Sequence, residues 1–215
     1  MKRIGITGPT GAGKTTALQA LAELDAHIID ADAVYHALLE SSATLRAELT
    51  ARFGPSILDG EGRVSRFGSV YGPDGKLERK KLGEIVFSDP AALSELNAIT
   101  HRFILAEIDR QAAGAEEQGR SAVAIDAIAL IESGLGETCG AIVGILAPRE
   151  LRIRRIMARE GISEDYARKR VEAQQGDGFF RTHCDYLLEN RADDTPEAFQ
   201  ARAKQLFEQI LSNRN

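Results

Sequence analysis

The sequence predicts an α/β fold in which a parallel five-stranded sheet is flanked by helices. Short apolar runs alternate with longer amphipathic segments along the 215 residues, as in a sheet with helices on both faces. A glycine-rich stretch directly follows the first apolar run, at the place where a strand would turn into a helix. A long, mostly helical segment separates the second and third predicted strands, which indicates a helical insertion.

The chain begins with two short strands and continues as helices. Ile4–Thr7 is short and apolar, and Thr15–Leu24 after it has helical spacing. His27–Asp30 is predicted as the second strand, and helical patterning then continues through Leu39. Ser42–Phe53 is expected to form the next helix, with Ser42 available as its N-cap.

The following segment, Gly54–Lys76, is rich in Gly, Pro, Asp and Ser and contains two Asp-Gly turn signals. These signals predict one or two hairpins or a mobile excursion. Helical spacing returns at Leu77–Phe87 and again at Pro90–Gln111.

The second half of the chain again alternates strands and helices. The expected elements are strands at Ser121–Ile125 and Ala141–Leu146, helices at 149–160 and 163–175, and a last strand at Tyr186–Leu188. Thr195-Pro196-Glu197 then opens a final helix, with threonine as N-cap and proline in the first helical position.

The composition is that of an ordinary globular protein, with 43% hydrophobic residues, 27% charged residues and a net charge of −5. The acidity argues against a broad nucleic-acid surface but leaves room for a local basic pocket. Cys139 and Cys184 lack metal-ligand spacing, and we expect buried free thiols. The chain start lacks a secretory apolar segment, and no apolar run approaches the roughly 20 residues of a membrane span. We therefore expect a cytoplasmic protein with no membrane or nucleic-acid partner.

Residues Gly8–Thr15 read GPTGAGKT and match the pattern G-x-x-x-x-G-K-S/T. Glycines let successive backbone N–H groups turn inward around a phosphate, and the following helix adds its own N–H groups and positive dipole end. The pattern assigns Lys14 to the β- and γ-phosphates and the Thr15 hydroxyl group to Mg²⁺. A glycine-rich turn without a ligand is the alternative, but the position between strand and helix favours a nucleoside triphosphate site.

Two carboxylates, Asp30 and Asp32, follow the second predicted strand. Ligands gather at the carboxyl ends of strands in open α/β sheets, so a carboxylate here could accept a proton from an attacking hydroxyl group. Asp32 could equally cap the helix Ala33–Leu39, because aspartate is a favoured N-cap residue. Asp30 could serve either role, and the sequence by itself leaves both open.

Arg149, Arg152, Arg155 and Arg159 are spaced by three or four residues and fall on one side of a predicted helix. A solvated charged face is one interpretation, because glutamates lie nearby in the sequence. Kinases that use nucleoside triphosphates need mobile arginines to neutralise the transferring phosphate, which favours a lid helix here.

The chain resembles the dephospho-coenzyme A kinases, P-loop kinases that phosphorylate the ribose 3′-hydroxyl group of dephospho-CoA. The likeness extends almost from end to end. Besides the glycine-rich loop, it rests on the segments IIDADAVYHAL, LERKKLGEIVF, LNAITH, ALIESGL, RIMAR, VEAQ and DYLLEN, in this order and with compatible spacing. The resemblance implies a P-loop kinase fold with ATP as phosphoryl donor and Mg²⁺ as cofactor.

The resemblance also implies a role for each matching position. Asp32 would be the general base on the acceptor hydroxyl group, and Arg79, His101 and Glu132 would shape the acceptor side. Arg155 would contact the ATP phosphates from the lid, and catalysis would rest on Asp32, Lys14 and Arg155. The implied ATP-binding residues are Gly11, Ala12, Gly13, Lys14, Thr15, Thr16, Arg155 and Asn190, with Asn190 near the adenine and Thr15 as metal ligand.

Local alternatives accompany these roles. Arg79 could be a surface helix charge, His101 a packing histidine and Glu132 a cap. Asp126 follows the third predicted strand, where it could hold the water shell of Mg²⁺ or belong to a turn.

The expected organisation is a single P-loop kinase domain over residues 1–215. Its core would comprise about 1–40, 120–147 and 184–215, its acceptor-binding insertion about 41–119 and its lid about 148–183. The chain departs from the family pattern where Arg102 replaces a proline after His101 and where Ile128 replaces another proline. Gly60–Lys76 is also longer than the usual connection, and all three departures fall on the acceptor side.

The expected function is ATP-dependent phosphorylation of dephospho-CoA to CoA, the last step of coenzyme A biosynthesis, with ATP and dephospho-CoA as small-molecule partners. One alternative is a related nucleoside or nucleotide kinase with another acceptor. A nucleotide-binding regulatory switch is a further alternative. A switch that uses GTP would carry a guanine-reading motif such as Asn-Lys-x-Asp, whereas Asn190 is followed by Arg191-Ala192-Asp193.

Overall fold

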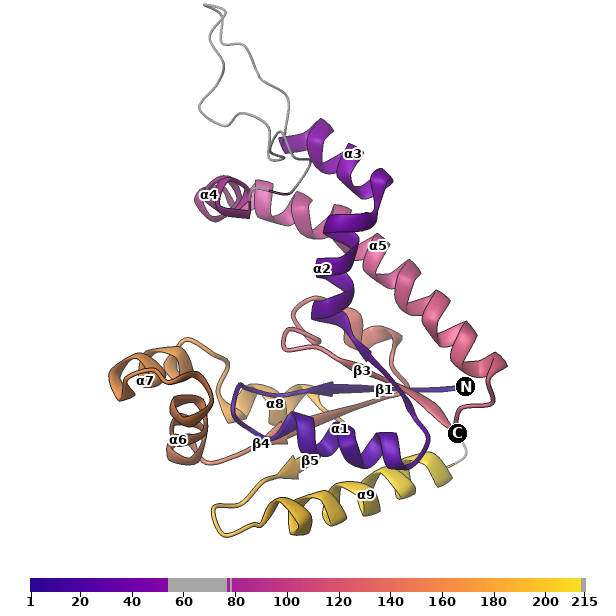
Figure 1. The fold of residues 1–215 in the computed structure, drawn as a ribbon, viewed down its shortest axis with the longest axis vertical. Coiled ribbons are helices and arrows are strands. Elements are labelled where there is room, and N and C mark those ends of the chain that lie inside the picture. Colours follow the sequence, from indigo (N-terminus) through magenta and orange to yellow (C-terminus); the bar gives the residue numbers. More distant parts are fainter. Residues whose placement is uncertain (54–76, 78, 214–215) are drawn as a thin grey trace, which may run out of the picture. The chain divides into compact units, whose positions relative to one another are not determined.

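The computed structural model describes residues 1–53, 77 and 79–213 (Figure 1). The chain divides into two compact units, one comprising Met1–Ala31 with Arg110–Asn215 and the other comprising Asp32–Asp109. The hairpins or excursion expected at Gly54–Lys76 lie outside the described residues.

Among its described residues, the first unit contains one five-stranded sheet in the order β2-β3-β1-β4-β5, with every pairing parallel. The strands are β1 (Lys2–Thr7), β2 (His27–Asp30), β3 (Ala122–Asp126), β4 (Ala141–Leu146) and β5 (Tyr186–Glu189). This arrangement confirms the predicted parallel α/β architecture. Because all strands run in one direction, their carboxyl ends meet at one edge of the sheet.

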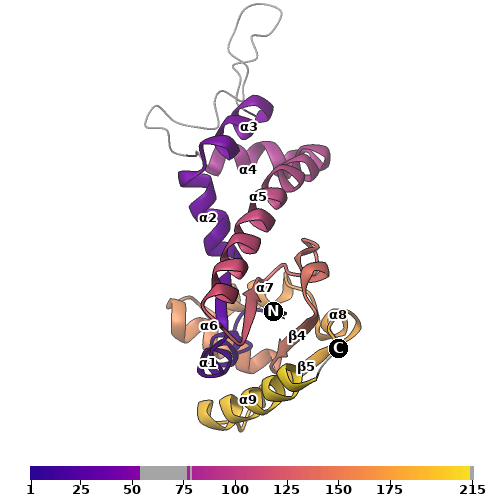
Figure 2. The same cartoon turned by 90° about the vertical axis from the view of Figure 1, so that its right-hand side faces the viewer.

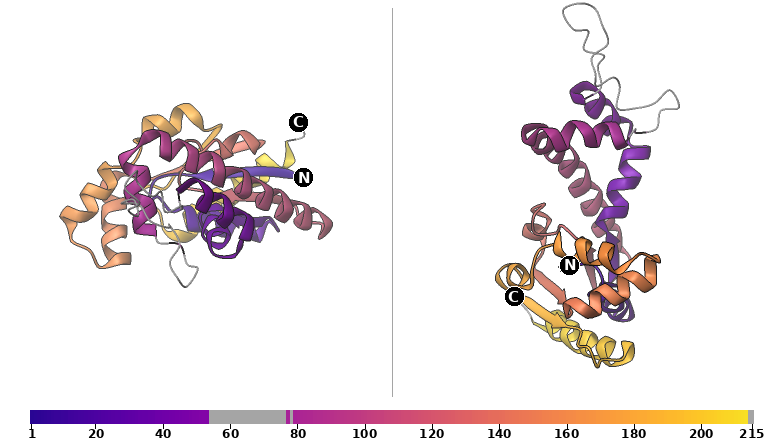
Figure 3. Two further views of the ribbon diagram at one scale, coloured as in Figure 1. Left: turned by 90° about the horizontal axis from the view of Figure 1, so that it is seen from above. Right: turned by 90° about the vertical axis from the view of Figure 1, so that its left-hand side faces the viewer.

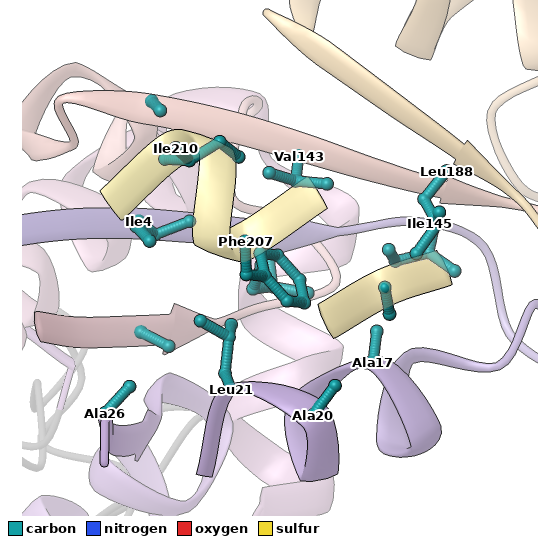
Figure 4. Close-up of a cluster of buried hydrophobic side chains, with 14 of the residues drawn as sticks. Ile4, Ala17, Ala20, Leu21, Ala26, Val143, Ile145, Leu188, Phe207 and Ile210 are labelled. Atoms are coloured by element: carbon teal, nitrogen blue, oxygen red, sulfur yellow. The ribbon is translucent and has the colours of Figure 1, made fainter. Parts of the chain in front are cut away.

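Helices α1 (Lys14–Glu23) and α9 (Pro196–Ser212) pack against each other on one face of this sheet (Figures 1 and 2). Their apolar side chains meet those of β1 and β4 in one core, shown in Figure 4, which includes Ile4, Ala17, Ala20, Leu21, Val143, Ile145, Phe207 and Ile210. The alanines of α1 leave room for close approach of α9, whose Phe207 is fully buried.

On the opposite face of the sheet, two strand glycines leave space that cysteine side chains occupy. A Cβ added to Gly5 would lie 3.0 Å from the sulfur of Cys139, and one added to Gly144 would lie 2.9 Å from that of Cys184. Both cysteines are free thiols, as the sequence predicts, but each is half-buried and not fully buried as expected. Burial raises the pKa of each thiol to about 11, so both stay protonated and poorly nucleophilic at neutral pH.

The segment between β4 and β5 folds as helices α6 (Arg149–Glu160), α7 (Glu164–Glu172) and α8 (Asp177–His183). Helices α6 and α7 pack as a pair (Figure 3) whose own small core consists of Ile153, Ile156, Ala167 and Val171. Ser163 caps α7, because its hydroxyl oxygen accepts a hydrogen bond from the N–H of Tyr166 at 3.4 Å.

The described part of the second unit is helical and has its own core. Its elements are α2 (Ala31–Ser41), α3 (Ala43–Phe53), α4 (Arg79–Ser88) and the larger part of α5 (Pro90–Glu117). The core residues are Leu39, Leu45, Leu49, Phe53, Leu82, Val86, Ala92 and Leu96. The hydroxyl oxygen of Ser42 accepts a hydrogen bond from the N–H of Leu45 at 3.2 Å, which confirms the predicted cap. Because Leu39 belongs to this core, the unit begins earlier than residue 41, the expected start of the insertion.

Two short elements were not predicted from the sequence: α8 and the 3₁₀ helix η1 (Leu135–Thr138). One helix, α5, is longer than expected. Helix α5 continues to Glu117 beyond the expected end at Gln111, because the buried Ala112 and Ala115 hold its last turns despite Gly114. No helix among the described residues has both the length and the apolarity needed to cross a membrane.

Candidate active site

The glycine-rich loop connects the carboxyl end of β1 to the first turn of α1. Gly8 has φ +143°, and a Cβ there would lie only 2.2 Å from the carbonyl oxygen of Ile145 on β4. Gly13 is the N-cap residue of α1 and has φ +108°, a left-handed conformation. Both positions therefore require glycine, one for close approach and the other for backbone conformation.

Three consecutive carbonyl oxygens of this loop accept hydrogen bonds from side chains in the carboxyl-terminal half of the chain. The pairs are Arg152 Nε to Thr10 at 3.0 Å, Arg155 Nη1 to Gly11 at 3.2 Å, and Asn190 Nδ2 to Ala12 at 3.1 Å. In a trans peptide the C=O and N–H groups point to opposite sides. These donors therefore turn the N–H groups of the same peptides away from themselves.

Several N–H groups around the loop are available for an anion. The N–H of Ala12 closes a turn onto the carbonyl of Pro9 at 3.2 Å. Within the described part of the chain, the N–H groups of Gly11, Gly13, Lys14 and Thr15 form no backbone hydrogen bond. Together with the positive end of the α1 dipole, these N–H groups form a phosphate-binding surface.

Lys14, the first residue of α1, forms an ion pair with Asp126 at the end of β3. Lys14 Nζ lies 2.9 Å from Asp126 Oδ1, and the two side chains are 15% and 20% exposed. Strand β3 runs beside β1 with Asp126 opposite Ile6, which brings this carboxylate next to the loop. Among the described residues, Asp126 Oδ1 accepts no hydrogen bond of regular geometry, so the nearby ammonium charge of Lys14 compensates it.

Asn190 follows β5 and fixes the position of both the loop and Arg155. Its side chain is 3% exposed, and its Oδ1 accepts a hydrogen bond from Arg155 Nη2 at 3.3 Å. A Cβ added to Gly13 would lie 2.4 Å from Asn190 Nδ2. Burial lowers the pKa of Arg155, and the charge of Asp194 opposes this effect, but the guanidinium group remains protonated.

The arginines of α6 separate into two kinds. Arg152 is buried and Arg155 is half-buried, and both contact the loop. Arg149 and Arg159 are exposed and form ion pairs with glutamates of the same helix pair. The interpretation as a solvated charged face therefore holds for Arg149 and Arg159, and the lid role of Arg152 and Arg155 stays a prediction.

A cavity of about 220 Å³ adjoins Asn190 at the carboxyl ends of β4 and β5. Its lining includes Leu146, Ala147, Pro148, Asp177, Arg181 and Asn190. The cavity combines an apolar wall from β4 with polar groups from α8 and the end of β5. Such a combination suits a flat, partly polar ring system.

Three further predicted residues lie in the first unit. Thr15 is exposed in the first turn of α1, and the N–H of Thr16 donates to the carbonyl of Gly13 at 3.1 Å. Glu132 is exposed in the turn before η1. The N-cap residue of η1 is Gly134, so the alternative that Glu132 is a cap is wrong.

The predicted acceptor-side residues Asp32, Arg79 and His101 belong to the second unit. Helix α2 begins at Ala31, so Asp32 lies within its first turn and is not the N-cap residue of a helix that starts at Ala33. Arg79 is the first residue of α4. His101 lies half-buried in α5, and its Nε2 has no hydrogen-bond partner among the described residues.

Of the two departures from proline, only the one at Arg102 has a structural explanation among the described residues. Arg102 lies inside α5 and forms an ion pair with Glu48 of α3, whereas a proline there would interrupt the helix. Ile128 is 45% exposed, and its carbonyl oxygen accepts a hydrogen bond from Thr7 Oγ1 at 3.1 Å.

Sequence reasoning assigned no role to Gln174, which contacts the loop at Thr10. The available signal was its position at the end of the segment VEAQ, which contributes to the family resemblance. The structure thus brings together the loop, Lys14, Arg155 and Asn190, as expected. It also places Asp126 and Arg152, two weaker candidates from the sequence, at the loop, and it adds Gln174.

Comparisons with known proteins agree with this geometry. A family model described as dephospho-CoA kinase matches residues 2–195. A dephospho-CoA kinase of Dehalococcoides mccartyi is 34% identical over 210 residues, which cover 97% of this chain and 99% of that protein. A dephospho-CoA kinase of Corynebacterium glutamicum is 34% identical over 215 residues and is covered completely, as is this chain.

Similar solved structures include one further dephospho-CoA kinase. The dephospho-CoA kinase from Campylobacter jejuni has a TM-score of 0.64 at 25% identity, with 98% of each chain covered. A Thermus thermophilus protein has a TM-score of 0.75 at 26% identity, with 99% of this chain and 98% of that chain covered. The chain belongs to the dephospho-CoA kinase family.

Proposed function

We propose that this protein transfers the γ-phosphoryl group of ATP to the ribose 3′-hydroxyl group of dephospho-CoA. The products are CoA and ADP, and the reaction is the last step of coenzyme A biosynthesis. The observation that carries the proposal is the glycine-rich loop, whose carbonyl groups are held from one side while its N–H groups remain available on the other. ATP and dephospho-CoA are cytoplasmic metabolites in this scheme, so we place the reaction in the cytoplasm.

ATP binding involves the loop and the residues that surround it. The N–H groups of the loop and of the first turn of α1 bind the phosphates, and Lys14 neutralises the β- and γ-phosphates. In the structure Lys14 pairs with Asp126, so its ammonium group is already held at the loop. Arg155 donates hydrogen bonds to the carbonyl oxygens of Gly11 and Ala12 in the structure, and in our proposal its guanidinium group leaves these oxygens and binds the phosphates when ATP is present. The cavity beside Asn190 accommodates the adenine.

The donor set around the loop fits Mg²⁺, a cation that prefers oxygen ligands. The Thr15 side chain is exposed, and its hydroxyl group has no hydrogen-bond partner among the described residues. Asp30 and Asp126 end the neighbouring strands β2 and β3 and are aligned with each other. When bound, Mg²⁺ supplies positive charge to the phosphate oxygens. Thr15 would be its protein ligand, and Asp126 would accept hydrogen bonds from its water shell.

Transfer requires removal of the proton from the acceptor hydroxyl group. In our proposal Asp32 accepts this proton as the 3′-oxygen forms a bond to the γ-phosphorus and the bond to the leaving oxygen of ADP breaks. Arg79, His101 and Glu132 contribute to the acceptor side. Asp32 follows β2 by two residues and lies in the first turn of α2.

A coupled ADP-release assay tests the proposal with a panel of acceptors: dephospho-CoA, nucleosides, nucleoside monophosphates and water alone. We expect kcat/KM for dephospho-CoA to exceed that for every other acceptor by orders of magnitude. Equal turnover over the panel would indicate a kinase of different acceptor specificity. ADP release with water alone would indicate a nucleotide hydrolase, and either result would overturn the proposed function.

A further inference from the structure

Gln174 lies between α7 and α8 and contacts the phosphate-binding loop from outside. Its Oε1 accepts hydrogen bonds from the N–H of Thr10 at 3.1 Å and from Nη2 of Arg152 at 2.8 Å. Its Nε2 donates a hydrogen bond to Oγ1 of Thr10 at 2.8 Å. A glutamine side chain has two acceptor sites and two N–H groups, so three of its four hydrogen-bonding positions are used on these two neighbours.

Arg152 completes this contact from helix α6. Its side chain is 4% exposed, and its Nε donates to the carbonyl oxygen of Thr10 at 3.0 Å. Burial lowers the pKa of Arg152, and Asp177 opposes this effect through its charge. Among the described residues, Arg152 forms no ion pair, so the oxygens of Gln174 and Thr10 are its direct partners. A buried cation needs such partners, and Gln174 therefore also keeps Arg152 at the loop.

Thr10 is thus held at its N–H, its hydroxyl group and its carbonyl group. The carbonyl group of Thr10 and the N–H group of Gly11 belong to the same peptide unit, and this N–H is one of those available to bind phosphate. Fixing the carbonyl on one side directs that N–H to the other side. The backbone of α6 also lies against the loop, because a Cβ added to Gly11 would lie 2.9 Å from the carbonyl oxygen of Arg152.

We propose that Gln174 is a positioning residue for nucleotide binding. By holding Thr10 and Arg152 together, it fixes the orientation of the Thr10–Gly11 peptide and links the α6–α7 pair to the loop. The inference rests on the proposed function only in that the loop binds a nucleotide, and it is independent of the acceptor. ADP binding can therefore test it even if the acceptor panel gives an unexpected result.

The test compares Gln174→Ala with Gln175→Ala, a matched control at the exposed neighbouring glutamine. Calorimetric titration with ADP should show a Kd about tenfold higher for Gln174→Ala, because the loop loses the hydrogen bonds that orient the Thr10–Gly11 peptide unit. Gln175→Ala should bind ADP like the unaltered protein. In steady-state assays, Gln174→Ala should raise KM for ATP much more than it lowers kcat, with KM for dephospho-CoA nearly unchanged.

Two further variants separate positioning from general folding effects. Gln174→Glu keeps an acceptor for the Thr10 N–H, for Arg152 and for the Thr10 hydroxyl group, so ADP affinity should largely recover. In a Thr10→Val background, which lacks one of the three hydrogen bonds, Gln174→Ala should cost less affinity than in the unaltered protein. Equal ADP affinity for Gln174→Ala and Gln175→Ala would overturn the proposal. It would also be overturned by a lower melting temperature without a change in Kd, or by complete additivity with Thr10→Val.

Discussion

Lys14 is positioned by its ion pair with Asp126 and by the first turn of α1, and its charge is the feature that function requires. We expect Lys14→Ala to lower turnover by at least about 10²-fold, because a methyl group cannot stabilise charge on the transferring phosphate. The fold should persist, since the lysine belongs to a partly exposed ion pair and not to the apolar core. ADP release and thermal unfolding measure the two effects. Lys204→Ala on α9 is the control, and near-normal turnover of Lys14→Ala would refute the phosphate-loop assignment.

Asp32 is the proton acceptor in the proposed reaction. Asparagine keeps the size of aspartate but cannot take a proton, so Asp32→Asn should lower kcat by roughly 10²–10⁴. ATP affinity should hardly change, and the loss of a favourable charge in the first turn of α2 should cost only about 0.3–1 kcal/mol of stability. Asp30→Asn is the matched control. If Asp30→Asn is the more damaging change in a kcat measurement, the other carboxylate is the base.

The loop residues could be predicted from the sequence because their chemistry is local. Gly8 lies too close to another backbone segment for a Cβ, and Gly13 has a positive φ that favours glycine. Both glycines belong to one short motif that can be recognised in the sequence. The contacts of Arg152 and Gln174 with Thr10 could not be predicted, since they join residues that are far apart in the sequence. Burial of Arg152 depends on how α6 packs on the loop, and a helical charge pattern does not reveal such packing.

Helix α9 shows how one terminal residue can determine the stability of an element. The hydroxyl oxygen of Thr195 accepts a hydrogen bond from the N–H of Ala198 at 3.1 Å. We expect Thr195→Ala to lower the free energy of unfolding by about 1 kcal/mol, because one N–H of the first turn loses its partner. Thr195→Ser retains the hydroxyl group and should be close to neutral. Denaturant unfolding measures both variants, and equal midpoints for them would contradict a capping role.

Elements with clear end signals were the ones that sequence could predict. Thr195-Pro196 marked the start of α9, and Ser42 marked the start of α3. Helix α8 has the start Gly176-Asp177-Gly178, which resembles a turn, and only the burial of Phe180 against the rest of the unit stabilises it as a helix. That burial is tertiary and has no signature in local spacing.

At the scale of the whole molecule, the two units have separate cores, and we expect them to open separately. Phe207→Ala should destabilise the first unit by about 3–5 kcal/mol and Leu49→Ala the second by about 2–5 kcal/mol, because both side chains are fully buried. Hydrogen exchange should therefore accelerate in β1 and β4 for Phe207→Ala, and in α3 and α4 for Leu49→Ala. Uniform acceleration along the chain in both variants would show that the two units open as one.

The packing of α9 against α1 has a consequence for the order in which the protein can fold during synthesis. Domains fold as units as the chain emerges, amino-terminal parts first. The helical unit Asp32–Asp109 is continuous, so its core residues are all present before residues 110–215 are made. The core that supports the phosphate-binding loop instead needs Phe199, Phe207 and Ile210 from the last helix. A nascent chain thus exposes β1 and α1 without their partner until α9 has been made, so the phosphate-binding loop is synthesised well before the core that supports it is complete.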